Sequence, residues 1–403
     1  MAVVLRRSLH PHKLAQMNAP PQSMKDDRRY LGLDLARSTA IGLVLVCHGC
    51  SVWQAYFGLQ APNWLLMTGS FGVELFFVLS GFLIGGILLE LIEKRPTFRE
   101  WGIFMIRRWM RTLPLYFAWL LVMALWDPPP AGQVAIYLQR YALLLQNFAW
   151  PMPADNWFAV SWSLAVEEWF YLLFSAFLFL AARLIGARRA AWAVTGAFIV
   201  IPFLLRFGVV EPSSFMTHVY KTVLYHLDAI AYGVVVALLQ RQGSVIFVAP
   251  YRCLALGLAT VLLCWGRFSG AWGTALISDQ AFLTWFSALT SIGFALCFPA
   301  TLKLRTLPRV IESAVLQLSK HSYGVYVIHL TVLSLFNYQI VGRGLNPWIG
   351  MGLAVVMIAW LAAASWKMFE EPILRARPRQ LAKLSPTNAD GPAQWIDLTK
   401  VSG

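Results

Sequence analysis

The sequence predicts an all-α polytopic membrane protein, built as a bundle of about ten transmembrane helices. Of its 403 residues, 58% are hydrophobic and 13% are charged, whereas soluble domains carry about 25% charged residues. Several windows of about 20 residues are almost free of charge, and that is the length that crosses a bilayer. The net charge of +14 could suggest nucleic-acid binding, but the Lys and Arg residues fall between the apolar segments. That placement is typical of the charge bias that orients membrane loops.

Ten apolar segments of the chain are predicted to span the membrane. The second span is followed by a basic stretch, for which we predict a cytoplasmic loop because positive charge collects on that side of the membrane. The amino terminus is then cytoplasmic as well. The basic stretch holds Lys94, Arg95, Arg99, Arg107, Arg108 and Arg111. The predicted spans are residues 36–57, 71–89, 113–126, 161–184, 191–209, 222–240, 253–268, 282–302, 318–340 and 348–368.

The segment from Val134 to Trp150 is ambiguous between a span and a re-entrant segment. If it crosses the membrane, the arginines that follow residues 161–184 lie on the outer face, against the charge bias. If it enters and returns, those arginines are cytoplasmic, and so are the later basic loops. We therefore predict a re-entrant segment at residues 134–150, with both chain termini in the cytoplasm.

Three regions follow from this topology. Residues 1–29 are basic and have no apolar run, so they predict a cytoplasmic tail rather than a cleaved signal peptide. Residues 30–377 form the transmembrane domain, and residues 378–403 form a second, short cytoplasmic tail. Cys47 and Cys50 make a C-x-x-C pattern, but a zinc site needs a second pair of ligands and a haem site needs C-x-x-C-H. We predict no metal site.

The first span carries an arginine and a histidine on one face. Arg37 and His48 are eleven residues apart, which on an α-helix is roughly 1100° of rotation and about 16 Å of rise. They therefore lie in line, one near the membrane surface and the other well inside the apolar run. An ionisable residue at that depth is usually functional. One interpretation of His48 is a histidine that is simply hydrogen-bonded within the helix bundle. The other is catalytic: because imidazole titrates near neutral pH, His48 could accept a proton from an alcohol that attacks an activated acyl group.

Two further arginines precede the third span. Arg108 and Arg111 lie at positions i and i+3, so they share a helix face at the predicted cytoplasmic surface. One interpretation is that they only orient the chain by their charge. The other is that they bind a phosphorylated cofactor, because guanidinium groups match the geometry of phosphate. With Arg37 they would form a basic mouth on the side where acyl-coenzyme A is available.

The span at residues 161–184 begins with two adjacent acids, Glu167 and Glu168. Neighbouring residues on a helix point about 100° apart, so the two carboxylates should have different surroundings, one toward the headgroups and the other inward. An inward Glu167 could orient or balance the charge of His48, as a carboxylate does behind a catalytic imidazole. The alternative is the ordinary preference of acids for helix starts.

A polar stripe marks the span at residues 318–340. Ser322, Tyr326 and His329 share one helix face, an arrangement that more often holds helices together than binds substrate. His226 with Asp228 is another intramembrane polar group, and Glu74 and Arg206 could each be half of a buried ion pair. The candidates for the wall of a substrate cavity are Asp34, Ser163, Tyr326 and His329.

Taken together, six strings in this order resemble the acyltransferase-3 family of bacterial membrane O-acyltransferases. They are LDLARSTAIGLVLVCH, FGVELFFVLSGFLI, RRWMRTLPLY, SWSLAVEEWFY, HSYGVYVIH and FEEP, the last at residues 369–372. Each string alone is weak, but six in the family's order cover most of the chain. The resemblance implies a bundle of about ten helices in a bacterial inner membrane. It also implies transfer of an acyl group, usually acetyl, from cytosolic acyl-coenzyme A to a carbohydrate or other hydroxylated acceptor.

Residue by residue, the resemblance implies that His48 is the catalytic base and that Glu167 is an essential acid. Arg37, Arg108 and Arg111 would bind the coenzyme. Some members of the family carry a periplasmic esterase-like domain after the bundle; we expect none here and so expect direct transfer, by His48 as base or through an acyl-His48 intermediate. The expected acceptor is a cell-surface or exported glycan, including a lipid-linked sugar. The alternatives are a small secondary metabolite such as a macrolide and, outside the family, a membrane transporter.

Overall fold

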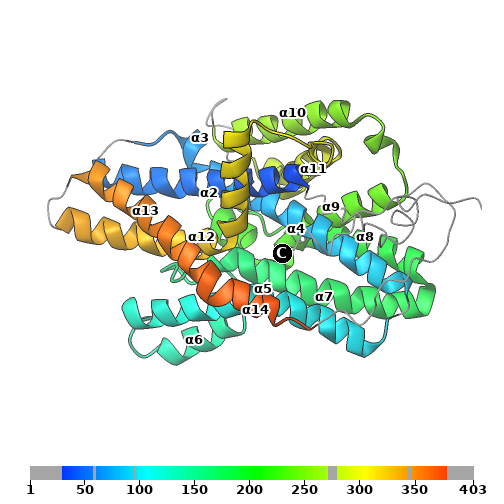
Figure 1. The fold of residues 1–403 in the computed structure, drawn as a ribbon, viewed down its shortest axis with the longest axis horizontal. Coiled ribbons are helices and arrows are strands. Elements are labelled where there is room, and N and C mark those ends of the chain that lie inside the picture. The colour runs from blue at the N-terminus through cyan, green and yellow to red at the C-terminus, as the bar shows by residue number, and fades with distance from the viewer. Residues whose placement is uncertain (1–29, 58–59, 95, 271–278, 343–345, 379–403) are drawn as a thin grey trace, which may run out of the picture.

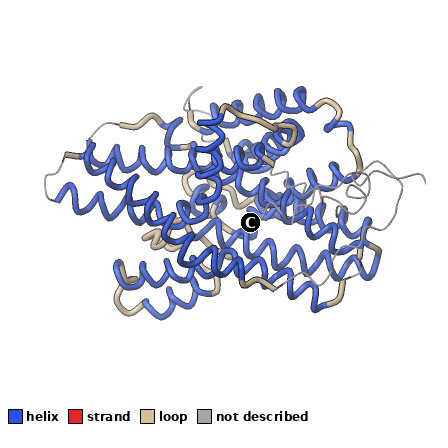
Figure 2. Tube along the Cα trace, viewed as in Figure 1, coloured by secondary structure: helices blue, strands red, loops and turns tan. Residues whose placement is uncertain are grey.

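The computed structural model describes residues 30–57, 60–94, 96–270, 279–342 and 346–378 (Figure 1). These residues form helices and no strand (Figure 2). The long helices are α2 (Leu31–Phe57), α4 (Thr68–Glu93), α5 (Phe98–Trp126), α7 (Ser161–Ile185), α8 (Ala187–Arg206), α9 (Val223–Arg241), α10 (Pro250–Phe268), α11 (Gln280–Thr301), α12 (Arg309–Gly342) and α13 (Pro347–Ser365). The short ones are α3 (Asn63–Leu66), α6 (Val134–Ala142), η1 (Phe215–Tyr220), η2 (Val245–Phe247), η4 (Trp366–Glu370) and α14 (Glu371–Arg375).

The predicted class, an all-α polytopic membrane protein, is confirmed. Within the described part of the chain, nine helices are long and apolar enough to cross a membrane. The predicted span at residues 318–340 lies in α12, a further helix of 34 residues that is not among those nine. Large apolar side chains are exposed on the outside of the bundle, for example Leu125 at 77% and Leu184 at 75%. Such surface suits contact with lipid rather than water. The predicted tails, residues 1–29 and 379–403, lie outside the described residues.

The stretch predicted as a basic loop before residue 113 is in fact helical. Helix α5 begins at Phe98, so Arg107, Arg108 and Arg111 lie on a helix and not in a loop. The helix starts with a capping box: the Thr97 side chain accepts a hydrogen bond from the backbone of Glu100, whose carboxylate accepts one from the backbone of Thr97. The loop assignment was wrong because it rested on charge alone, whereas the prediction that Arg108 and Arg111 share a helix is confirmed.

The ambiguous segment does not cross the bilayer as one helix. Helix α6 has nine residues and so rises only about 14 Å. The chain then returns to where it left: the indole Nε1 of Trp157, just before α7, donates a hydrogen bond of 2.5 Å to the carbonyl of Asp127, at the end of α5. This path agrees with the re-entrant prediction and makes α5 and α7 antiparallel neighbours.

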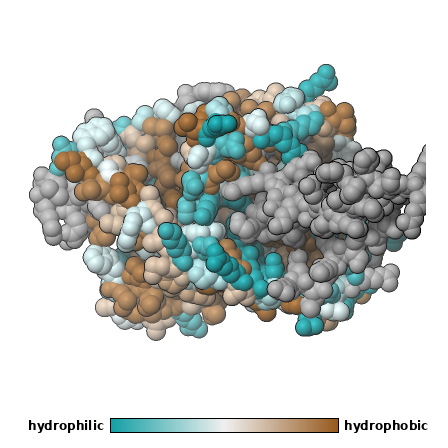
Figure 3. Space-filling view, viewed as in Figure 1, coloured by the Kyte–Doolittle hydropathy of each residue, from teal (hydrophilic) through white to brown (hydrophobic). Residues whose placement is uncertain are grey.

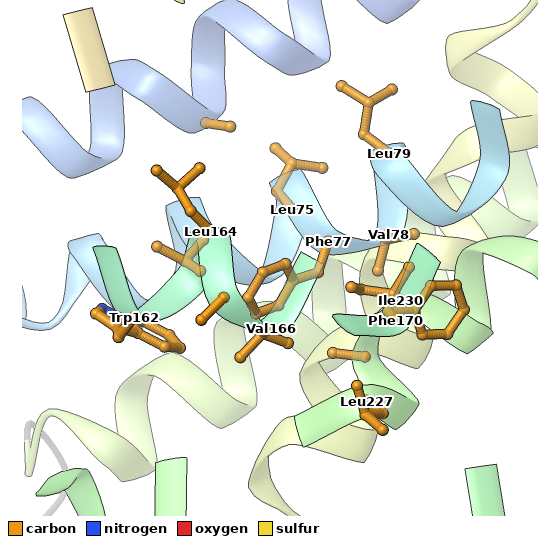
Figure 4. Packing of buried hydrophobic residues seen from close by; sticks show 14 of the residues in the cluster. Leu75, Phe77, Val78, Leu79, Trp162, Leu164, Val166, Phe170, Leu227 and Ile230 are labelled. Atoms are coloured by element: carbon orange, nitrogen blue, oxygen red, sulfur yellow. The ribbon is translucent and has the colours of Figure 1, made fainter. Parts of the chain in front are cut away.

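The centre of the bundle is a close contact between α4 and α9. A Cβ atom added to Gly81 would lie 1.8 Å from the carbonyl oxygen of Ile230, and one added to Gly233 would lie 2.1 Å from that of Val78. Small residues allow membrane helices to approach in this way. Figure 4 shows Phe77 and Val78 of α4 toward Val166 and Phe170 of α7 and Ile230 of α9, while Leu75 and Leu79 point to the other side of α4.

Two buried polar pairs hold the same region together. Arg206 makes a bidentate ion pair with Asp228, at 2.9 and 2.6 Å, and the Nε2 atom of His226 lies within hydrogen-bonding distance of Glu74, at 2.8 Å. The prediction that Arg206 is half of a buried ion pair is thereby confirmed, and the buried partner of Glu74 is a histidine. Their partners, His226 and Asp228, do not line either of the cavities described below. These pairs belong to the scaffold.

Candidate active site between two cavities

A cavity in the bundle collects most of the predicted site residues. It encloses about 900 Å³, its open part included. We call it the arginine cavity, because Arg37, Arg108 and Arg111 line it. Its remaining wall comes from α4, α5, α7 and α12, and consists of Val73, Phe76, Phe77, Leu79, Ser80, Leu83, Ile84, Ile87, Thr112, Ser163, Leu164, Glu167, Ser322, Tyr323 and Tyr326. The long apolar stretch of α4 thus faces three cations.

Arg37 is held in place from two sides. Its Nη1 atom lies 3.9 Å from the carboxylate of Asp34, one helical turn earlier. The same nitrogen donates a hydrogen bond of 3.3 Å to the hydroxyl of Ser319 on α12, which in turn donates one of 2.5 Å to Asp34. Asp34 is buried behind Arg37 and does not line the cavity. Its role here is to position Arg37, so its predicted place in the cavity wall is wrong.

Arg108 is fixed by a carboxylate and a phenol. Its Nη2 atom lies 3.7 Å from Glu167 and donates a hydrogen bond of 2.6 Å to the hydroxyl of Tyr171. The guanidinium also stacks over the ring of Tyr171, at 4.2 Å from its centroid. The Tyr171 hydroxyl is bonded to that of Ser80 as well. These contacts leave the arginine charged and rigid at the cavity wall.

The structure does not place Glu167 beside His48. Glu167 is paired with Arg108 instead, and it faces the arginine cavity. Glu168 is buried and accepts a hydrogen bond of 2.6 Å from Thr112. The two acids do have different surroundings, but neither points to the headgroups as expected, because the helix start lies inside the bundle rather than at its surface.

Arg111 lies among charges of both signs. Arg37 and Arg108 are near enough to repel it, and Glu370 is near enough to attract it. Glu370 is buried and accepts a hydrogen bond of 3.4 Å from Ser365. It belongs to the FEEP string, for which the sequence indicated no role. The only signal in the sequence was an acid at the end of the last apolar segment.

A hydrogen bond joins two of the predicted wall residues of the arginine cavity. Ser163 of α7 and Tyr326 of α12 both line the cavity, and their hydroxyls lie 2.5 Å apart. One turn farther along α12 comes His329, whose side chain is fully buried. The Nε2 atom of His329 lies 2.9 Å from the Nδ1 atom of His48. The two histidines therefore lie about one helical turn from the Ser163–Tyr326 contact, but neither lines this cavity or the second one described below, so the predicted place of His329 in a cavity wall is wrong.

The hydrogen bonds of this pair determine where its protons lie. The Nδ1 atom of His329 faces the carbonyls of Tyr326 and Val325, at 2.8 and 3.1 Å. A carbonyl only accepts, so this nitrogen carries a hydrogen and the Nε2 atom of the neutral ring does not. The Nδ1 atom of His48 must then donate to His329. The lone pair of His48 is left on Nε2, where a base needs it.

A second cavity lies between the end of α5, the loop before α7 and α12, and neither His48 nor His329 is among the residues that line it. We call it the tryptophan cavity, because Trp126 and Trp157 line it with residues of the loop before α7 and of α12. It holds about 1720 Å³, its open part included. Leu330 and Thr331, which directly follow His329, form part of its wall.

Lys221 lies near both the tryptophan cavity and His48. Its ammonium donates a hydrogen bond of 3.4 Å to Asn156, another wall residue of the tryptophan cavity, and it is near enough to act electrostatically on His48. Burial lowers the pKa of Lys221. A polar substrate that entered through the tryptophan cavity would approach the imidazole of His48 without passing the arginines.

The arrangement has the parts that an acyl transfer needs. Arginine side chains at one end suit a phosphorylated donor, and the apolar wall of α4 suits the arm that follows the phosphates. A neutral imidazole with its lone pair on Nε2 can take a proton from an attacking hydroxyl. Two separate cavities, each with part of its wall on α12, would admit two substrates.

Comparison with known proteins gives the same assignment. A family model described as an acyltransferase domain, acyltransferase-3, matches residues 30–367. The peptidoglycan O-acetyltransferase OatA of Listeria monocytogenes is 26% identical over 339 residues, which cover 76% of this chain and 51% of that protein. The O-acetyltransferase OatA of Staphylococcus aureus is 24% identical over 371 residues, covering 86% and 57%. The chain spans about half the length of these curated relatives, and no solved structure matches it. On the extent of the family match, the chain belongs to the acyltransferase-3 family.

Proposed function

We propose that this protein is a membrane O-acetyltransferase that moves an acetyl group from cytosolic acetyl-coenzyme A to a hydroxyl of a cell-surface or exported glycan. The observation that carries the proposal is the line of groups from Arg37, through the arginine cavity, to His48. The named activity of the relatives, O-acetylation of peptidoglycan, supports a glycan acceptor. The positive charge at the arginine end supports a coenzyme donor entering from the cytosol.

In the proposed reaction, the coenzyme phosphates bind at the arginines and the thioester lies toward the histidine pair. The acceptor hydroxyl enters through the tryptophan cavity and attacks the acetyl carbonyl. The Nε2 atom of His48 takes the hydroxyl proton as the new C–O bond forms. When the C–S bond breaks, that proton passes to the departing thiolate, so the products are an O-acetyl ester and free coenzyme A.

The catalytic assignment is tested by replacing His48 with alanine. We expect acetyl transfer to fall at least about 100-fold, the usual contribution of a general base. Acetate on the surface glycan of a deletion strain, complemented with each variant, is measured by mass spectrometry. His218→Ala is the matched control, because His218 is exposed and remote from both cavities. Full acetylation with a correctly inserted His48→Ala protein would show that His48 is not the base.

The donor is tested separately. Purified protein should bind coenzyme A, and the double variant Arg108→Ala, Arg111→Ala should lose that binding. If purified protein instead moves substrate across proteoliposomes without any coenzyme, the protein is a transporter. If the deletion strain lacks acetate on a small secondary metabolite but not on its glycans, the acceptor class is wrong while the transferase remains.

A further inference from the structure

The arginine end of the site holds more guanidinium groups than the three that line the cavity. Arg37 is paired with Asp34, Arg108 with Glu167, and Arg111 lies within range of Glu370. Two other arginines approach this group from outside the cavity wall. They are Arg107 on α5 and Arg377 just after α14.

Arg377 is the unusual member of this group. It is half-buried, and its Nε and Nη2 atoms are inaccessible to solvent yet have no hydrogen-bond partner among the described residues. Its nearest charges have the same sign: Arg107 and Arg108 both repel it. Burial, followed by this repulsion, lowers the pKa of Arg377 to about 10. The group is therefore still a cation at neutral pH, half-buried beside other cations.

The backbone around Arg377 is held against α5. The Nη1 atom of Arg107 donates a hydrogen bond to the carbonyl of Pro378, the residue that follows Arg377. Helix α14, which precedes it, packs on α5 (Figure 1). On the face shown in Figure 3, a strip of hydrophilic residues crosses the middle of the molecule where α14 lies in Figure 1. These contacts fix the position of Arg377, so its proximity to the other arginines is a feature of the fold.

A buried cation among like charges is unfavourable unless an anion neutralises it. Two unpartnered N–H groups on one rigid guanidinium fork match two oxygens of a phosphate. Arg377 does not line the arginine cavity, so a ligand that reached both the cavity arginines and Arg377 would have to extend past the cavity wall. Coenzyme A has this shape: counted from the thioester, the pyrophosphate comes first and the ribose 3′-phosphate comes last.

We propose that Arg377, supported by Arg107, binds the ribose 3′-phosphate of the coenzyme, while Arg37, Arg108 and Arg111 take the pyrophosphate. This assignment rests on the proposed function, since it concerns the donor of that reaction. It makes the segment at residues 376–378 part of the donor site. A phospholipid headgroup offers the same phosphate chemistry, and the experiment distinguishes the two.

The test compares coenzyme A with 3′-dephospho-coenzyme A, which lacks only that phosphate. Dissociation constants are measured for wild type and Arg377→Ala in nanodiscs of neutral phosphatidylcholine. Wild type should bind coenzyme A about 10- to 100-fold more tightly than the dephospho form, the value of a charge-assisted contact. Arg377→Ala should bind both ligands alike. Arg375→Ala is the matched control, because Arg375 is exposed and paired with Glu371, and it should keep the wild-type ratio.

The outcomes separate this assignment from the proposed function. If wild type binds neither ligand, the coenzyme donor itself is wrong. If wild type binds and Arg377→Ala keeps the preference for coenzyme A, only the role of Arg377 is wrong. The same holds if Arg377→Ala changes the response to phosphatidylglycerol nanodiscs but not the preference, because Arg377 then serves lipid.

Stability without ligand provides an independent readout. Removal of an unpaired buried cation should leave the melting temperature of the ligand-free protein unchanged or raise it. A lower melting temperature together with an unchanged ligand preference would indicate a purely structural residue and overturn the proposal. Should the alanine variant not fold, Arg377→Lys answers the question: it keeps the charge but not the fork, and should retain only part of the preference for the 3′-phosphate.

Discussion

The role of His329 leads to the sharpest prediction about catalysis. His329 is fully buried, and its Nε2 atom accepts the hydrogen that the Nδ1 atom of His48 donates, at 2.9 Å. Replacing His329 with phenylalanine keeps an aromatic ring in the space but removes the acceptor. A buried donor left without its partner costs about 1–3 kcal/mol. Since about 1.4 kcal/mol is a tenfold change in rate, we expect kcat to fall about 10- to 100-fold. KM for acetyl-coenzyme A should not change, because His329 touches none of the arginines.

The assay is transfer of labelled acetyl from acetyl-coenzyme A by purified protein in nanodiscs. His329→Gln should recover part of the lost kcat, since its amide oxygen can accept the hydrogen from His48. The control is His321→Phe on the same helix, whose ring lies against Trp366 and outside both cavities. A His329→Phe protein with wild-type kcat, or one whose loss appears in KM alone, would refute the reasoning about the histidine pair.

Two further predictions concern the scaffold. Gly81→Ala should lower the melting temperature strongly, because the added Cβ atom would lie 1.8 Å from the carbonyl oxygen of Ile230. The control is Gly196→Ala on α8, where an added Cβ atom meets nothing within 4 Å; this change should be neutral or slightly stabilising. Equal melting temperatures for the two variants would show that α4 and α9 can separate at no cost. Asp228→Asn should destabilise the fold by about 3–5 kcal/mol, because it leaves the buried charge of Arg206 without a partner, and chemical denaturation in detergent that shows less than about 1 kcal/mol would contradict a structural role for the pair.

Much of the fold could be predicted because a bilayer imposes simple rules on sequence. A span must be apolar for about 20 residues, so the helices appear in the sequence as uncharged windows. That rule fails where a helix continues past the apolar window, as α5 does for fifteen residues before position 113. There the arginines are part of the helix, and the better signal was the spacing of Thr97 and Glu100.

The site was predictable within one helix but not between helices. Arg37 and His48 share α2, so the helical repeat alone places them in line. The partner of His48 depends on how α12 packs on α2, and no periodicity in the sequence contains that information. For this reason the acid on α7 was expected behind His48, and His329 was expected only in a cavity wall. Glu370 was missed because its role depends on proximity to Arg111, about 260 residues earlier in the chain.

The division of the molecule into scaffold and site makes these experiments separable. Helix α4 contributes to both: Ser80 and Leu83 line the arginine cavity, while Gly81 and Gly85 press against α9 on the opposite side of the helix. The proposed chemistry depends on α2 and α12, which meet through His48 and His329 rather than through the glycine contact. A change at Gly81 should therefore lower stability before it lowers kcat per folded molecule, whereas a change at His329 should lower kcat with little effect on donor binding. If both variants instead lost stability and kcat in proportion, the histidine contact would be another part of the scaffold, and the position of the base would have to be sought elsewhere along the two cavities.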